Sequence, residues 1–204
     1  MDCLHGEEFR LDRIACVPWL FLEGVIKEGD RVVDATAGNG RDTLALARLV
    51  GPRGGVDTLD VQEAALARTR VLVEANCLEG RVRLWLRDHA GLADVVVPGI
   101  RAAVFNLGYL PGGDHGVTTG PLSTLAAVQG AMGLLCPGGV VLVTVYRGHP
   151  GGMEEGACLT EFLQQVSSRA FTVMVGKLLN HEAKAPFWVI IQAKRLSETV
   201  KRDG

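Results

Sequence analysis

The chain has 204 residues, 21 basic against 23 acidic side chains, a net charge of -2, and 48% hydrophobic residues. This composition excludes a disordered or fibrous chain. It also excludes a global positive field for nonspecific nucleic-acid binding, so any RNA contact has to be local. At this length we expect a single domain over residues 1–204.

Five cysteines and five histidines are scattered along the chain, without a C-x-x-C pair and without a recognisable signal peptide. Scattered cysteines without a signal peptide favour a reducing compartment, so we expect a cytoplasmic protein. Structural zinc sites need clustered ligands, so we expect no metal. The longest apolar stretch, residues 138–146, is too short to cross a bilayer. We therefore expect no membrane segment.

The first third of the chain predicts two strand–helix units. A β-branched strand over 31–34 is followed by a glycine-rich turn and a helix over 42–50. Glycine and proline at 51–55 break the chain before a second strand over 56–59 and a helix over 62–76. This order is typical of an α/β protein.

The same alternation continues to the end of the chain. Further strands are predicted at 82–86, 102–106, 140–146, 171–179 and 187–193, helices at 124–135 and 161–167, a helix or loop at 94–97 and a turn at 137–139. Apolar strands alternating with helices imply a mostly parallel seven-stranded sheet covered on both faces. The last two strands predict an antiparallel hairpin at the sheet edge.

The turn after the first strand has the form D-x-x-x-G-x-G and runs from Asp34 through Gly38 to Gly40. Open α/β sheets bind ligands at the carboxyl ends of their strands, and glycines allow close backbone approach. A second acid, Asp60, ends the second strand, from which a carboxylate reaches ribose hydroxyls. These features predict a nucleoside-derived cofactor, the alternative being a plain turn with Asp60 as a helix cap.

Two nucleoside cofactors compete for this turn. A dinucleotide site prefers a third glycine where this chain has Thr43. Asp34, which we expect to point into the crevice, suits the ammonium and sulfonium of S-adenosylmethionine (SAM) better than two phosphates. We therefore predict SAM, with a nicotinamide dinucleotide as the weaker alternative.

Other polar residues of these turns are candidate cofactor contacts. Asn39 and Asp42 could hydrogen-bond the amino-acid end of SAM or cap the helix that starts here. Gln62 could reach the adenosine or remain exposed. Asp88 and His89 follow the third strand, where adenine edges are commonly met; the alternative is a capped turn with a solvated histidine.

The fourth strand ends in Asn106, and the segment that follows, 107–115, is rich in glycine and proline. It partly resembles the N-P-P-Y loops of amino-group methyltransferases, with Leu107 and Gly108 in place of the two prolines. An amine must present its lone pair in line with the methyl carbon, and the neutral oxygen of Asn106 could aim it by accepting N–H groups. We therefore place Asn106 at the reacting atoms.

Three residues of the same segment are further candidates. Tyr109 could stack on a base or fill the edge of the core. Asp114 and His115 could help remove the amine proton, or be turn residues.

Loops near the carboxyl end of the chain carry scattered basic residues. The candidates for a local phosphate-binding patch are Arg147, His149, Lys177, His181 and Lys184. Glycine-rich loops also need polar residues for solubility alone.

Four strings together resemble one bacterial family. They are DATAGNGRDTL at 34–44, DVQ at 60–62, FNLGYLPGGD at 105–114 and YRGHPGG at 146–152. The family is that of tRNA (5-aminomethyl-2-thiouridine) methyltransferases, formerly labelled rRNA methylases. The likeness spans roughly residues 14–193, and the string NLGYLPGGD is its most specific part.

The resemblance implies a Rossmann-like class I methyltransferase fold and SAM-dependent methylation of the aminomethyl nitrogen of the wobble uridine in the tRNA anticodon arm. The product would be 5-methylaminomethyl-2-thiouridine. It also implies cofactor contacts at Asn39, Asp42, Asp60, Gln62 and His89. This chain departs from the family pattern at His115, where lysine is expected, and at His181, where glutamine is expected.

Other functions remain open at this point. The acceptor could be rRNA or a small amine, and a SAM-binding module without turnover is a further alternative. A chain of this size offers little surface to read an anticodon arm, so we expect that a homodimer could extend it.

Overall fold

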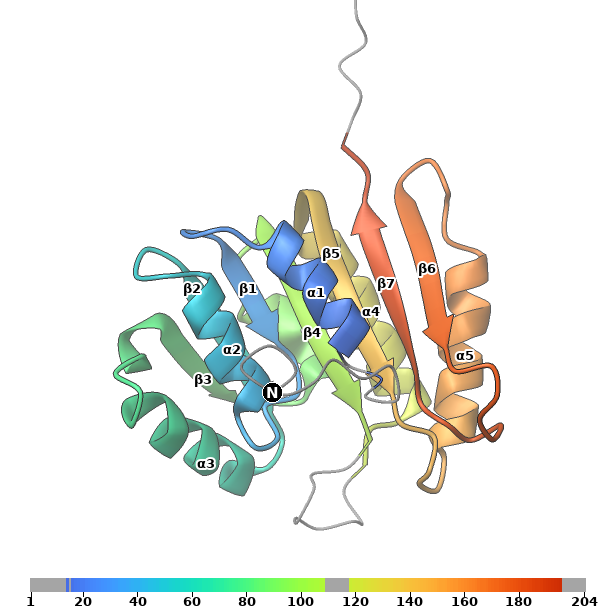
Figure 1. The fold of residues 1–204 in the computed structure, drawn as a ribbon, viewed down its shortest axis with the longest axis horizontal. Coiled ribbons are helices and arrows are strands. Elements are labelled where there is room, and N and C mark those ends of the chain that lie inside the picture. Colours follow the sequence, from blue (N-terminus) through green and yellow to red (C-terminus); the bar gives the residue numbers. More distant parts are fainter. Residues whose placement is uncertain (1–13, 15, 109–117, 196–204) are drawn as a thin grey trace, which may run out of the picture.

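The computed structural model describes residues 14, 16–108 and 118–195, and its centre is a seven-stranded sheet (Figure 1). The strands are β1 (Arg31–Asp34), β2 (Gly55–Asp60), β3 (Val82–Leu86), β4 (Ile100–Leu107), β5 (Leu135–Val145), β6 (Phe171–Lys177) and β7 (Phe187–Ala193). Their order is β3-β2-β1-β4-β5-β7-β6. The strands from β1 to β5 pair in parallel, while β7 is antiparallel to both β5 and β6. The predicted mixed sheet and terminal hairpin are confirmed.

Helices cover both faces of the sheet (Figure 1). They are α1 (Cys16–Val25), α2 (Arg41–Leu49), α3 (Glu63–Glu74), α4 (Pro121–Leu134) and α5 (Gly152–Gln164), with 3₁₀ turns η1 (Glu79–Arg81) and η2 (His89–Asp94). One core contains α1, α2 and α3, and the other contains η2, α4 and α5. Alternate residues of β4 enter the two cores: Val104 packs in the first and Phe105 in the second. The period of two along a strand thus builds both cores.

The helix α1 was not predicted. Its sequence, CVPWLFLEGV, is apolar nearly all round, so no helical period marks it. Pro18 lies in the first turn, where its missing N–H removes no hydrogen bond within the helix. Trp19 and Leu22 are buried against the sheet, and this packing explains the helix.

The start of helix α5 was predicted too far along the chain, at residue 161 of a helix over 161–167. It begins at Gly152, within a glycine-rich stretch that propensity alone disfavours. Gly156 shows why a glycine is nevertheless present in this helix, because a Cβ there would lie 3.1 Å from the ring of Phe187 and 3.3 Å from Val145. The small residue lets the helix pack closely on β5 and β7.

The predicted turn at 137–139 lies inside β5 as an irregularity in its pairing with β4. The partner of Ile100 is Leu135, whereas the partner of Ala102 is Val140. Gly138 has a φ of 80°, which accommodates the extra residues.

Parallel pairing brings the carboxyl ends of β1 to β5 to one edge of the sheet. The strand order reverses between β1 and β4, and this is the point at which open α/β sheets bind ligands. Within the described ranges, every helix is too short or too polar to cross a membrane.

Candidate functional site

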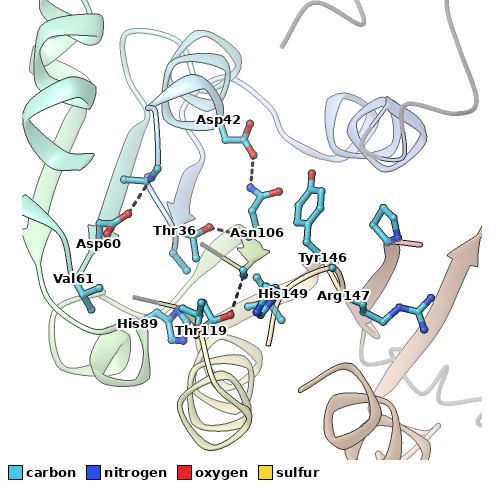
Figure 2. Close-up of a pocket in the computed structure, with 18 of the residues that line it drawn as sticks. Thr36, Asp42, Asp60, Val61, His89, Asn106, Thr119, Tyr146, Arg147 and His149 are labelled. Carbon is cyan, nitrogen blue, oxygen red and sulfur yellow. Dashed lines mark hydrogen bonds between the residues drawn. The ribbon is translucent and has the colours of Figure 1, made fainter. Parts of the chain in front are cut away.

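A cavity of about 1240 Å³ opens at this edge. Its wall is built from the segments after β1 to β5 and from the loop between β6 and β7 (Figure 2). The predicted site residues that line it are Gly38, Asn39, Asp42, Asp60, Gln62, Asp88, His89, Asn106, Arg147, His149, His181 and Lys184. Tyr109, Asp114 and His115 lie outside the described residues. The volume exceeds the usual upper range of about 1000 Å³ for a small-ligand pocket, so it has room for a cofactor and an acceptor.

Asp60 ties the glycine turn to the end of β2. Its Oδ2 accepts the N–H of Gly38 at 3.0 Å, and its Oδ1 accepts the N–H of Gln62 at 2.9 Å. An ionised carboxylate has roughly four lone-pair positions, so two acceptor positions remain for ligand hydroxyls. Asp60 therefore holds the turn and still presents an acceptor to the cavity.

Asp34 does not face the crevice, so that expectation is wrong. Its carboxylate is fully buried, and it accepts the hydroxyl of Thr43 at 2.6 Å and the N–H of Thr36 at 3.2 Å. Burial, followed by the charge of Asp42, raises the pKa of Asp34 to about 7. Asp34 supports the turn from beneath instead of meeting a ligand.

Gly40 does not line the cavity either. Its φ is 76°, and a Cβ at this position would lie 2.8 Å from the Cα of Thr69 in α3. The glycine allows the start of α2 to pack against α3. Its role in the structure is therefore close packing behind the turn.

Asn106 is fixed at both its backbone and its side chain. The backbone N–H donates to the hydroxyl of Thr36 at 2.8 Å, and Nδ2 donates to Oδ2 of Asp42 at 2.7 Å (Figure 2). Because an ionised carboxylate can only accept, the amide nitrogen faces Asp42 and the carbonyl oxygen Oδ1 remains an acceptor. Burial raises the pKa of Asp42, and the hydrogen bond from Asn106 opposes that shift.

Tyr146 lines the cavity, although it was not predicted as a site residue. It follows β5, its N–H donates to the carbonyl of Leu107 at 3.2 Å, and its ring lies beside Asn106 (Figure 2). Partial burial and then the charge of Asp42 raise the pKa of the Tyr146 phenol. An aromatic residue at the end of a predicted strand was the available signal.

His89 is buried in the cavity wall, so the alternative of a solvated histidine is wrong. Its ring meets Phe105 edge-on at 5.9 Å, and burial lowers its pKa. Its Nε2 makes no hydrogen bond in the described part of the chain. Asp88 does cap the turn, since its Oδ1 accepts the N–H of Ala90 at 2.8 Å. A buried nitrogen without a hydrogen-bond partner fits a site that a polar ligand completes.

The basic residues of the rim are only partly brought together. Lys177 does not line the cavity. Lys184 lines it, but its ammonium pairs with Glu182 at 3.6 Å. The Nε of Arg147 donates to the carbonyl of Ala185 at 2.9 Å, and its guanidinium stacks 5.1 Å from the ring centre of Phe187. Arg147 thus anchors the loop between β6 and β7.

The donor set fits SAM. Carboxylate oxygens at Asp60 and Asp42 suit hydroxyls and an ammonium, and His89 offers an unused nitrogen. In the ranges that the structure describes, no three His, Cys, Asp or Glu side chains are grouped to hold a metal.

Comparisons with known proteins agree with this arrangement. The sequence of residues 56–192 matches the family described as "Putative rRNA methylase". A chloroplastic tRNA (mnm(5)s(2)U34)-methyltransferase of Arabidopsis thaliana is 40% identical over 168 residues. The alignment covers 76% of this chain and 60% of the length of that relative.

Two solved structures share the fold at substantial identity. A protein from Clostridium thermocellum described as "putative rRNA-methylase" superposes with a TM-score of 0.86 at 38% identity, over 88% of this chain and 97% of its own. A protein from Streptococcus mutans described as "a putative methyltransferase", solved in complex with SAH, gives a TM-score of 0.81 at 36% identity, over 89% of this chain and 98% of its own. The chain therefore belongs to the family described as "Putative rRNA methylase", a family of SAM-dependent methyltransferases with the class I fold.

Proposed function

We propose that the protein methylates the aminomethyl nitrogen of wobble 5-aminomethyl-2-thiouridine in the anticodon arm of tRNA, giving 5-methylaminomethyl-2-thiouridine. The observation that carries the proposal is the position of Asn106. Its side chain stands in the same cavity as the cofactor turn, with its nitrogen held by Asp42. The Arabidopsis relative, whose name describes this modification, supports the choice of acceptor.

The half of the cavity around β1 to β3 would hold SAM. Asp60 and Gln62 would bind the adenosine, His89 would lie at the base, and Asn39 and Asp42 would meet the amino-acid end. When bound, SAM supplies a methyl carbon attached to a positively charged sulfur; an uncharged amine can attack that carbon, and the sulfur leaves with the bonding electrons. The wall around Asn106 and Tyr146 is left for the acceptor.

Asn106 would position the acceptor amine. Because Nδ2 is held by Asp42, Oδ1 can accept an N–H of the amine and aim its lone pair. A primary alkylamine is largely protonated at neutral pH and has to lose a proton before or during attack. Asp114 and His115 remain our candidates for receiving that proton, and Tyr109 for stacking on the base.

The test is methyl transfer from labelled SAM to tRNA that lacks only this last methyl group. We expect the label in the wobble nucleoside after digestion to nucleosides. tRNA that already carries the methyl group is the matched control and should remain unlabelled.

Further arms of the assay separate the alternatives. Transfer to rRNA fragments or to free alkylamines, with none to the tRNA, would replace this acceptor with another. SAM binding without transfer to any of the three would indicate a module without turnover.

A further inference from the structure

The carboxylate of Glu155 lies beneath the acceptor side of the cavity and has no part in the chemistry described so far. It belongs to the first turn of α5 and is only 1% exposed. None of the ion pairs that the described residues form includes it. Burying an acid is costly unless hydrogen bonds compensate, so its partners indicate its role.

Those partners are two hydroxyl groups from other elements. Oε2 accepts the hydroxyl of Thr119 at 2.9 Å, and Oε1 accepts the hydroxyl of Thr124, in the first turn of α4, at 2.5 Å. A charged acceptor makes stronger hydrogen bonds than a neutral one. Glu155 therefore joins the start of α5 to the start of α4 and to the segment before it.

Thr119 passes this restraint on to the end of β4. Its hydroxyl donates to Glu155. The same oxygen accepts the N–H of Gly108 at 2.9 Å (Figure 2). The N–H of Thr119 in turn donates to the carbonyl of Gly108 at 2.9 Å. Because the Thr119 hydroxyl donates its proton in the hydrogen bond to Glu155, a lone pair of the hydroxyl oxygen is left to accept the N–H of Gly108.

We propose that Glu155 is a positioning residue for the acceptor side of the site. It holds Gly108 and Thr119 together, although ten residues, 109–118, separate them in the sequence. Gly108 is also two residues from Asn106, so the same restraint fixes the end of the strand that carries the amide. The proposal rests on the proposed function in assigning Asn106 to the acceptor amine.

Hydrogen exchange on the full chain tests the restraint without any catalytic readout. In Glu155→Ala and in Thr119→Val, we expect the amides at positions 108 and 119 to exchange about tenfold faster. The reason is that each substitution removes a member of the hydrogen-bond network that joins these two positions. Amides in the middle of β5 should keep their rates. Thr119→Ser keeps the hydroxyl and should restore slow exchange.

Thr160→Val is the matched control, because the Thr160 hydroxyl also lies in α5 but donates only to the carbonyl of Gly156. Its exchange pattern should equal that of the unchanged chain. Unchanged rates at Gly108 and Thr119 in both test variants would overturn the proposal. So would an equal acceleration across the whole sheet, which would indicate a purely structural role.

Kinetics then link the restraint to the reaction. In Thr119→Val we expect kcat with the tRNA acceptor to fall about tenfold, since small displacements at a reacting centre have large effects. The Kd for SAM should stay within about threefold. A loss of SAM affinity equal to the loss of kcat contradicts the assignment. If the unchanged chain itself fails to methylate tRNA, the proposed function fails, whereas hydrogen exchange still decides the role of Glu155.

Discussion

The two halves of the cavity are held together in different ways. Around the cofactor turn, Asp60 binds backbone N–H groups at Gly38 and Gln62, at the ends of neighbouring strands. On the acceptor side, Asn106 meets Asp42, 64 residues away in the sequence. The first half is built from backbone at adjacent strand ends, and the second from side chains that only the fold brings together.

This difference separates what each half can tolerate. A backbone-built turn depends on conformations that few residue types adopt, so its sequence is constrained and recognisable. A network of side chains depends on pairs of partners, so changing one member leaves the other unsatisfied. We therefore expect substitutions in the two halves to affect different measurable quantities.

The largest effect should come from Asn106→Ala. We expect kcat with tRNA to fall by roughly 100-fold or more, with SAM affinity nearly unchanged, because the amide aims the acceptor and not the cofactor. Single-turnover kinetics and calorimetry measure the two quantities. Asn76→Ala is the control, since Asn76 bonds Arg48 and Leu72 far from the cavity. A parallel collapse of SAM binding would show that the two halves are not separate.

Gly40→Ala should destabilise the fold itself. The positive φ and the contact with the Thr69 backbone together predict a loss of about 2 to 3 kcal/mol in unfolding free energy. Denaturant unfolding measures it. Gly24→Ala, at a helical position with nothing within 4 Å of the added Cβ, should be neutral or stabilising. Equal stability of the two variants would refute the packing role of Gly40.

Asp60→Ala should weaken SAM binding by about 2 kcal/mol, or roughly 30-fold in Kd. The reason is that the carboxylate both fixes Gly38 and offers acceptors to the cavity. The control is Asp94→Ala, which removes an exposed carboxylate paired with Arg87 and should not alter affinity. If isothermal titration gives the same Kd for both variants, Asp60 makes no contact with the cofactor.

A further expected effect concerns the pH dependence of stability. The pKa of Asp34 is raised to about 7, so between about pH 4 and 7 the folded chain keeps a proton that the unfolded chain releases. The stability contribution of protonated Asp34 is therefore full below pH 4 and is lost as the pH rises through 7. Asp34→Asn removes this titration, and its stability relative to the unchanged chain should rise across that window. A constant difference from pH 4 to 8 would contradict the shift.

The cofactor half was readable from the sequence because its signals are local. The D-x-x-x-G-x-G turn and Asp60 follow strands with clear patterns, and all but two of the predicted cofactor residues line the cavity. The exceptions, Asp34 and Gly40, have roles that depend on Thr43 and Thr69, and no spacing rule reveals those contacts.

The acceptor half was less readable for the same reason. Asn106 was predicted from its place after a strand, but its partner Asp42 was assigned only to the cofactor. Glu155 stood in a stretch where no helix was expected, so nothing marked it as buried. Arg147 looked like a phosphate ligand, whereas its partner is a backbone carbonyl in a distant loop.

The antiparallel β7 also explains how members of such a family could diverge. Because β7 runs antiparallel to β5, β7 begins at the edge of the sheet where β5 ends. The tip of the last hairpin therefore lies at the cavity, where His181 and Pro186 form part of the wall. A hairpin tip tolerates insertion and exchange without altering the pairing of its two strands. The architecture thus places a rim that tolerates exchange above a floor built from paired strands, and the entrance can be reshaped without altering that floor.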